Sequence, residues 1–497
     1  MLHHKSFWLC LLVLALGAGA WAQLPDPTPT PVAAEVVEQI YQGAHAATTW
    51  SKTVFGLLLV LILTVMSFEI VDKSIVTMLG ALVCLGLAYS PWFELISHTA
   101  SGHGVTPFYI STIDWSTIGV IIGTSIFVEL ASRSGIFTWS ALKLTRASRG
   151  DPFRLLVFYS LLTVFFSAFL NNVTAMIIVG SLTVVSCRRL NLSLLPYIFV
   201  EGILTNVGGL LTLISSLPNI IIGNTAGITF ARFFFTSAPY TLLASLATIY
   251  YARRVFPTTR PLKCLEKQDI ARERVMEFDP SEAVKDTRSF WTAWLGMLVV
   301  ILGFAFQAQI PVLRDMGLEA VALGAATLFL LLKAPHDVEA TVDMVEWSMV
   351  LFFASLFVII GVMDHAGVLE AIGQGLQLLL KLPSFLAWTT VLWASAAASA
   401  VTDNIPLAAL LAKILAQIGT SPRSGLWWAV IFGANLGGNI TPIGSASTVV
   451  AMTIMKKEKL DLSFASFVKL ALPFAAIQLL LATGYLLLLW LLGFLEV

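Results

Sequence analysis

The sequence predicts an all-α polytopic membrane protein made of two inverted repeats, with re-entrant hairpins and broken transmembrane helices. Three observations support this fold class. Of the 497 residues, 57 % are hydrophobic and 12 % are charged, whereas roughly a quarter of the residues in soluble domains are charged. Apolar segments recur along the chain with lengths near the roughly 20 residues that a helix needs to cross a bilayer. Three pairs of motifs also occur in the same order in the two halves of the chain.

Composition and motifs argue against several classes of protein. A formal net charge of zero gives no support for nucleic-acid binding, and no ten-residue alternating pattern indicates a β-barrel. The four cysteines have no spacing that suggests a disulfide framework or a metal cluster. The sequence contains no HExxH, GxSxG or P-loop motif. We therefore expect neither an enzyme nor an ATP-driven pump, and no metal or cofactor beyond transported or coupling ions.

The N-terminal region reads as a targeting segment followed by a spacer. Residues 1–22 combine a weakly basic start, a short apolar run and Ala20-Trp21-Ala22, which is typical of a cleaved signal peptide. An uncleaved first membrane helix is the alternative. Residues 23–53 then form a proline-rich linker that we expect outside the cell.

The hydrophobic material divides into two halves, residues 54–251 and 291–497. The charged segment between them, residues 252–290, is expected in the cytoplasm. Motifs in the first half recur about 230 positions later, which indicates an internal duplication. The matched pairs are Asp114-Trp115 with Glu346-Trp347, SAFLNNVTA (167–175) with SAVTDNIPL (399–407), and NVGG from Asn206 with NLGG from Asn435.

The positions of the basic residues predict how the halves are oriented, because Lys and Arg in short loops stay on the cytoplasmic side. With an external N-terminus, spans at about 54–69, 74–90 and 114–131 bring the chain inside. Basic residues then flank both ends of the apolar arms around Asn171-Asn172, which predicts a re-entrant hairpin. The second half starts from the opposite side, so its hairpin enters from the other face. We expect about ten spans after signal removal, in a multi-pass protein of the cell (inner) membrane.

The hairpin tips and the interrupted spans carry polar residues that a membrane helix ordinarily lacks. Secondary transporters place their sites at such breaks, near the midplane between inverted repeats. Helix capping by Asn, Asp or Thr and close helix packing by glycines are the alternatives, although glycine also suits unwound backbone. The candidate substrate- or ion-binding residues are Asn171, Asn172, Thr174, Asn206, Gly208, Gly209, Asp403, Asn404, Asn435, Gly437, Gly438 and Thr441.

Charged residues inside the predicted spans are few. Asp403 is the main charge at a tip, and an aspartate at a helix centre costs about 2.5–3.5 kcal/mol. Glu201, just before Asn206, and Glu129, in the third span, are candidate proton relays or buried groups that hydrogen-bond to a neighbouring helix. No Lys or Arg is near a tip in the sequence. Lys413 is the nearest, roughly 15 Å beyond Asp403 along a helix.

The stretches SAFLNNVTAMII, FVEGILTNVGGLLTLISSLPNIIIGNTAGITF and FDPSEAVKDTRSF resemble the ion transporter superfamily, and the likeness runs from about residue 54 to the end. It is closest to the branch of arsenite efflux permeases, the pink-eyed-dilution melanosomal permease and D-type sodium/proton antiporters, with a citrate-transporter-like domain. The resemblance implies a homodimer in which a scaffold domain holds a moving transport domain. Related sodium-coupled symporters have Ser-Asn-Thr at both tips, where this chain has Asn171-Asn172-Val173 and Asp403-Asn404-Ile405.

Residues and resemblance together predict an ion-coupled secondary transporter whose partners are the lipid bilayer and a small inorganic ion or organic anion. The first expectation is a cation (Na⁺)/H⁺ antiporter or an arsenite-type anion efflux permease. The alternative is a sodium-coupled symporter of di- or tricarboxylates such as citrate. A channel is a third interpretation, which single-channel currents would distinguish from saturable coupled flux.

Overall fold

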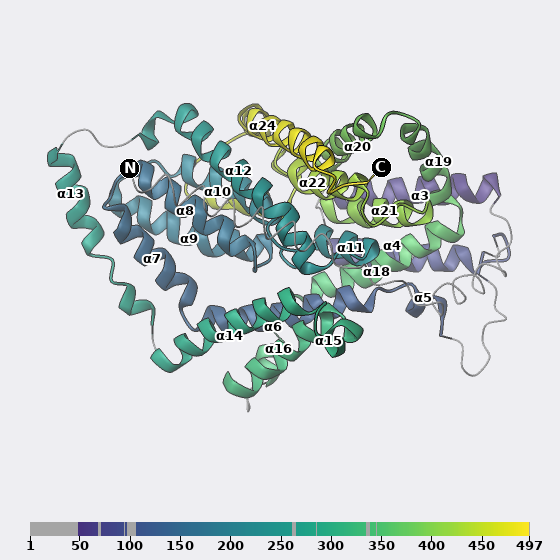
Figure 1. Ribbon diagram of the computed structural model, residues 1–497, viewed down its shortest axis with the longest axis horizontal. Coiled ribbons are helices and arrows are strands. Elements are labelled where there is room, and N and C mark those ends of the chain that lie inside the picture. The colour runs from purple at the N-terminus through teal and green to yellow at the C-terminus, as the bar shows by residue number, and fades with distance from the viewer. Residues whose placement is uncertain are drawn as a thin grey trace.

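The computed structural model describes residues 48–67, 71–93, 95–96, 106–260, 265–284, 286–333, 338–343 and 345–496. The described part is helical throughout, apart from one isolated bridge between Ser424 and Glu496 (Figure 1). The predicted signal peptide and nearly all of the predicted linker at 23–53 lie outside the described residues.

The first half of the chain forms ten helices in its described part, and both predicted interruptions appear in it. A hairpin turns between α8 and α9, and a break separates α10 from α11. The helices are α3 (Thr49–Ser67), α4 (Lys73–Ala88), α5 (Phe108–Ser111), α6 (Trp115–Arg133), α7 (Ile136–Ser148), α8 (Pro152–Ser167), α9 (Asn172–Leu190), α10 (Leu195–Gly208), α11 (Leu217–Ala226) and α12 (Phe230–Val255).

The second half repeats this plan after a short helical connection. Its hairpin lies between α20 and α21, and its break lies between α22 and α23. The elements are η2 (Pro257–Thr259), α13 (Leu265–Met276), η3 (Pro280–Ala283), α14 (Thr287–Phe306), α15 (Pro311–Met316), α16 (Leu318–Lys333), α17 (Val338–Val342), α18 (Trp347–His365), α19 (Val368–Leu380), α20 (Ser384–Ser399), α21 (Asn404–Gln417), α22 (Gly425–Gly437), α23 (Ala446–Lys457) and α24 (Phe464–Leu491).

Helices α6 to α12 correspond one by one to α18 to α24. Even the turns agree: α7 and α19 each follow a glycine with a left-handed backbone, Gly135 (φ 80°) and Gly367 (φ 73°). Glycine adopts this conformation without the steric cost that a Cβ atom brings. The predicted fold class, two inverted repeats with hairpins and broken helices, is confirmed.

The helices form two groups by their packing. The first group, which we call the scaffold helices, consists of α3, α4, α6, α14, α16 and α18. Within it, α4 packs on α18 and α3, and α6 packs on α16 and α14. In the second, the core helices α8 to α11 and α20 to α23, α8 packs on α10 and α20 on α22, while α23 contacts α9 and α10, and α11 contacts α21. The repeats therefore interlock within the core. Figure 1 shows α6, α14 and α16 grouped beside this core.

Seven helices of the described part are long and apolar enough to cross a membrane, by length and composition: α3, α6, α9, α12, α14, α18 and α24. Of these, α9 is a hairpin arm. The other six, together with the shorter apolar helices α4 and α16 and the two broken helices, make up the predicted ten or so spans.

Candidate ion-binding site at the hairpin tips

Both hairpin tips open into a helix through a capping side chain. The Oδ1 atom of Asn171 accepts the Val173 N–H at 2.7 Å, and Oδ1 of Asp403 accepts the Ile405 N–H at 3.0 Å. Such caps satisfy one of the free N–H groups at a helix start. Each cap uses a single oxygen of Asp403 or Asn171. The capping interpretation and the ligand interpretation are therefore compatible, because the rest of the polar group remains to contact other groups.

The breaks in the spanning helices are tied to the hairpin tips by matching hydroxyl contacts. Thr212, between α10 and α11, donates to the Ala168 carbonyl at the first tip. Thr441, between α22 and α23, donates to the Ala400 carbonyl at the second tip at 2.6 Å. Backbone that leaves a helix inside a membrane must find such partners. Thr441 thus fixes the tip against the break of its own repeat.

The paired glycines are explained by close approach and not by unwound backbone. Gly209 and Gly438 have ordinary right-handed helical angles, with φ of −57° and −59°. The unwound geometry that glycine tolerates is therefore not found at Gly209 and Gly438, and the close approach of a ligand to these glycines stays a prediction. A methyl group at Gly437 would stand 2.3 Å from the Ala396 carbonyl oxygen, and one at Gly208 would stand 2.7 Å from the Cα atom of Val164. Each glycine thus lets a broken helix touch a hairpin arm.

We expect the Gly437→Ala substitution to destabilise the protein by about 1–3 kcal/mol, the usual cost of overpacking a well-packed core. Gly56→Ala is the matched control, because a methyl group there meets nothing within 4 Å. Thermal unfolding of the purified variants in detergent measures both. Equal midpoints for Gly437→Ala and Gly56→Ala would show that the α20–α22 contact tolerates the extra carbon.

Asn206 and Asn435 lie at the ends of α10 and α22, where the side chain of each contacts the other repeat. Both are fully buried. The Asn206 amide donates to Ser445 Oγ at 2.8 Å, and Ser216 Oγ donates to Asn435 Oδ1 at 2.8 Å. The two contacts join corresponding residues of the two repeats. They place both predicted asparagines in one polar network between the halves of the core.

At the first tip this network leaves two oxygen atoms without partners. The amide of Asn172 donates to Asn206 Oδ1 at 3.2 Å, but Asn172 Oδ1 is buried and has no hydrogen-bond partner among the described residues. Ser167 Oγ, on the last residue of α8, is in the same situation. Methyl groups on Gly208 and Gly209 would meet Ser167 and Asn172 respectively, each at 2.9 Å. Because buried polar atoms are ordinarily satisfied, these two oxygens are candidate ligands for an ion.

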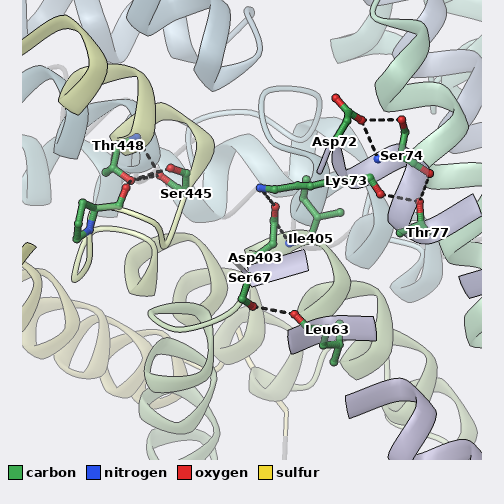
Figure 2. Close-up of polar contacts among 11 residues, drawn as sticks. Leu63, Ser67, Asp72, Lys73, Ser74, Thr77, Asp403, Ile405, Ser445 and Thr448 are labelled. Atoms are coloured by element: carbon green, nitrogen blue, oxygen red, sulfur yellow. Dashed lines mark hydrogen bonds and ion pairs between the residues drawn. The ribbon is translucent and has the colours of Figure 1, made fainter. Parts of the chain in front are cut away.

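At the second tip, Asp403 is paired with a lysine from a scaffold helix. Nζ of Lys73, the first residue of α4, is 2.7 Å from Asp403 Oδ2 (Figure 2). The expectation that no basic residue lies near a tip is therefore wrong. Lys413 does not fill this place, because its ammonium is 3.9 Å from Asp364 and half of its side chain is exposed. The companion Asn404 is buried at the start of α21.

At the first tip, an acid from a scaffold helix lies opposite the asparagine. The Asn171 amide donates to both carboxylate oxygens of Glu346, at 3.0 and 3.2 Å, and Thr174 also hydrogen-bonds to this carboxylate. Glu346 served in the sequence only as a landmark of the repeat. The sequence signal that could have pointed to it is its position just before an apolar span, which Asp114 shares in the first repeat. The site therefore contains two acids and a lysine where the sequence indicated one acid.

The two candidate proton relays lie apart from the tips. Glu201 on α10 is buried and accepts a hydrogen bond from Thr183 at 2.7 Å, while its other carboxylate oxygen has no partner among the described residues. Glu129 is partly exposed and pairs with Arg133 one turn along α6, at 3.2 Å. In the described part of the chain, no hydrogen bond or ion pair joins either acid directly to a tip residue.

Comparisons with known proteins agree with this architecture. Residues 57–433 match the profile of a family described as citrate transporter. An uncharacterised transporter of Mycobacterium tuberculosis is 29 % identical over 421 residues, which cover 84 % of this chain and 93 % of that protein. The human P protein is 29 % identical over 495 residues, covering 84 % of this chain and 58 % of the P protein.

Among solved structures, the YdaH transporter of Alcanivorax borkumensis, described as having an unusual topology, is similar with a TM-score of 0.56 and 14 % sequence identity. The match covers 85 % of this chain and 99 % of that one. At this level of identity the likeness concerns the fold alone. Because the match includes most of both chains, the likeness covers scaffold helices as well as core helices.

Proposed function

Because the chain belongs to the citrate transporter family of membrane transporters, we propose that it is an ion-coupled secondary transporter that exchanges a monovalent cation such as Na⁺ for protons. The observation that carries the proposal is Asp403, an acid whose side chain is 10 % exposed at a tip that meets the scaffold. Intramembrane acids of this kind are costly and mark ion or proton pathways. Bound either to a cation or to a proton, Asp403 would couple the two fluxes.

The neutral oxygens at the first tip support the same proposal. Asn172 Oδ1 and Ser167 Oγ are buried without partners, and alkali cations bind to carbonyl, hydroxyl and carboxylate oxygens. The ligand set contains no sulfur or imidazole. Transported ions would thus bind between the tips and the breaks, as in other inverted-repeat transporters. No cofactor beyond these ions is required.

Sodium-coupled uptake of a di- or tricarboxylate is the second candidate. Lys73 supplies the positive charge near a tip that was not expected from the sequence. The helices α9 and α21 begin at the tips, where helix N-termini attract anions. In the present conformation the Lys73 charge is neutralised by Asp403. An anion, whether a carboxylate or an arsenite-type ion, would have to displace this acid, which is why cation exchange is placed first.

The alternating motion we infer is that of an elevator. The core helices would move together past the scaffold helices, carrying both tips. The proposal includes a homodimer held by the scaffold, as the family resemblance implies, and a location in the cell (inner) membrane. Cross-linking in native membranes tests the dimer independently of transport.

Proteoliposomes with an internal pH dye test the function directly. After a proton gradient is imposed, Na⁺, Li⁺, K⁺, arsenite or citrate is added outside, with protein-free liposomes as the control. We expect Na⁺ or Li⁺ to dissipate the gradient with saturable kinetics. If citrate moves in a Na⁺-dependent way while no cation alone dissipates the gradient, the exchange proposal is wrong and the symport candidate replaces it.

A further inference from the structure

The Lys73–Asp403 ion pair joins the scaffold helices to the core helices at the proposed cation site. On the basis of the proposed function, we propose that Lys73 is a built-in competitor for the transported cation. Its ammonium holds the Asp403 carboxylate while the site is empty, and an arriving cation displaces it. Lys73 would thereby be a specificity-determining residue that sets the apparent cation affinity.

The competition follows from the use of the two carboxylate oxygens. Oδ1 of Asp403 caps α21 through the Ile405 N–H at 3.0 Å, and Oδ2 lies 2.7 Å from Lys73 Nζ. A cation bound to Oδ2 would lie within about 5 Å of the ammonium on the same carboxylate, and repulsion between these two like charges makes them compete. About a quarter of the Lys73 side chain is exposed, against a tenth for Asp403, so the lysine is the more exposed member of the pair.

The scaffold offers the displaced ammonium a second acid. Asp72, adjacent to Lys73, accepts hydrogen bonds from the Ser74 N–H at 2.9 Å and from Ser348 Oγ at 2.8 Å. These contacts fix Asp72 against α18, and its carboxylate interacts electrostatically with Lys73. Figure 2 shows Asp72, Lys73 and Asp403 in this order. The displaced ammonium would stay under the electrostatic influence of this second carboxylate, which lessens the cost of leaving a buried charge without a direct partner.

Cation binding would then also loosen the docking of the tip. Breaking the Lys73–Asp403 pair removes one polar contact between the scaffold and a tip, while the contacts of Asn171 and Thr174 with Glu346 have no direct part in it. An occupied core would be freer to move than an empty one at this position. If the core moves more readily when a cation occupies the site than when the site is empty, exchange is favoured over uncoupled leak.

The test is a Na⁺ titration of thermal stability in detergent, with choline chloride holding the ionic strength constant, alongside Na⁺-driven flux in liposomes. In Lys73→Met we expect the half-saturating Na⁺ concentration to fall about tenfold or more, which corresponds to about 1.4 kcal/mol. Lys73→Arg, which keeps the charge, should stay close to the wild type. Lys73→Gln serves as a second neutral variant should Lys73→Met not fold.

The double variant Lys73→Met/Asp403→Asn should lose the Na⁺ response, since the gain in affinity acts through Asp403. An unchanged or higher half-saturating concentration in both neutral variants, with the wild type active, would overturn the competitor role and leave the proposed function standing. A wild type without any cation-driven flux or cation-dependent stabilisation by Na⁺, Li⁺ or K⁺ would overturn both.

Discussion

Asp403→Asn is expected to abolish Na⁺-driven proton flux in proteoliposomes while the protein still folds. Removing a unit charge about 4 Å from a bound cation costs on the order of 4 kcal/mol at an effective dielectric constant of about 20. Since each 1.4 kcal/mol is a factor of ten, we expect a loss of about 1,000-fold in apparent affinity. Folding survives because asparagine is as good a helix cap as aspartate, so the Ile405 contact is kept.

Asp364→Asn is the matched control for this experiment. Like Asp403, Asp364 is an acid that contacts a lysine, Lys413 at 3.9 Å, and it also hydrogen-bonds to Gln417, but it lies within α18 and not at a tip. Its variant should transport within about threefold of the wild type, as expected for a weak, partly exposed ion pair. Equal flux in Asp403→Asn and Asp364→Asn would remove Asp403 from the ion site.

The tips and the breaks were predictable because their signals are local. An asparagine or aspartate after an apolar run, followed by Pro406 in one case, indicates a helix start within a few residues. The structure begins α9 at Asn172 and α21 at Asn404, each directly after its cap. The fold followed from the same logic, since the duplicated motifs specify matched helices in matched order.

The partners of the tips were not predictable in the same way. Lys73 is 330 positions from Asp403, and Glu346 is 175 positions from Asn171. Which scaffold residues meet the tips depends on how the core packs against α4 and α18, and no local pattern encodes that contact. Lys413 was the nearest base along the helix, yet a residue several turns away on a straight helix cannot reach its start.

The glycine motifs show a different limit. The sequence left unwound backbone, ligand approach and close helix packing open as reasons for them, because a glycine required for unusual backbone and a glycine required for close approach look identical in a sequence. Only the short distances from Gly437 to Ala396 and from Gly208 to Val164 separate the two explanations.

Asn435→Leu is expected to cause the largest loss of stability. Leucine would leave Ser216 Oγ and Asn219 Oδ1 without the amide that now contacts them at 2.8 and 3.0 Å. Each buried polar group left unsatisfied costs about 1–3 kcal/mol, so the total is about 2–6 kcal/mol. Thermal unfolding in detergent should show a much lower midpoint, with loss of the monodisperse peak on size exclusion near physiological temperature.

Asn224→Leu separates this effect from the general cost of replacing an amide. Asn224 is half-buried on α11, and among the described residues its side chain makes only long hydrogen bonds, at 3.5 Å to Ser116 and 3.3 Å to Thr117. Hydrogen bonds between membrane helices average only about 0.6 kcal/mol, because the unfolded chain in lipid also finds partners. If Asn435→Leu were as mild as Asn224→Leu, that average would apply here too. The prediction that the cross-repeat asparagines stabilise the core would then be wrong.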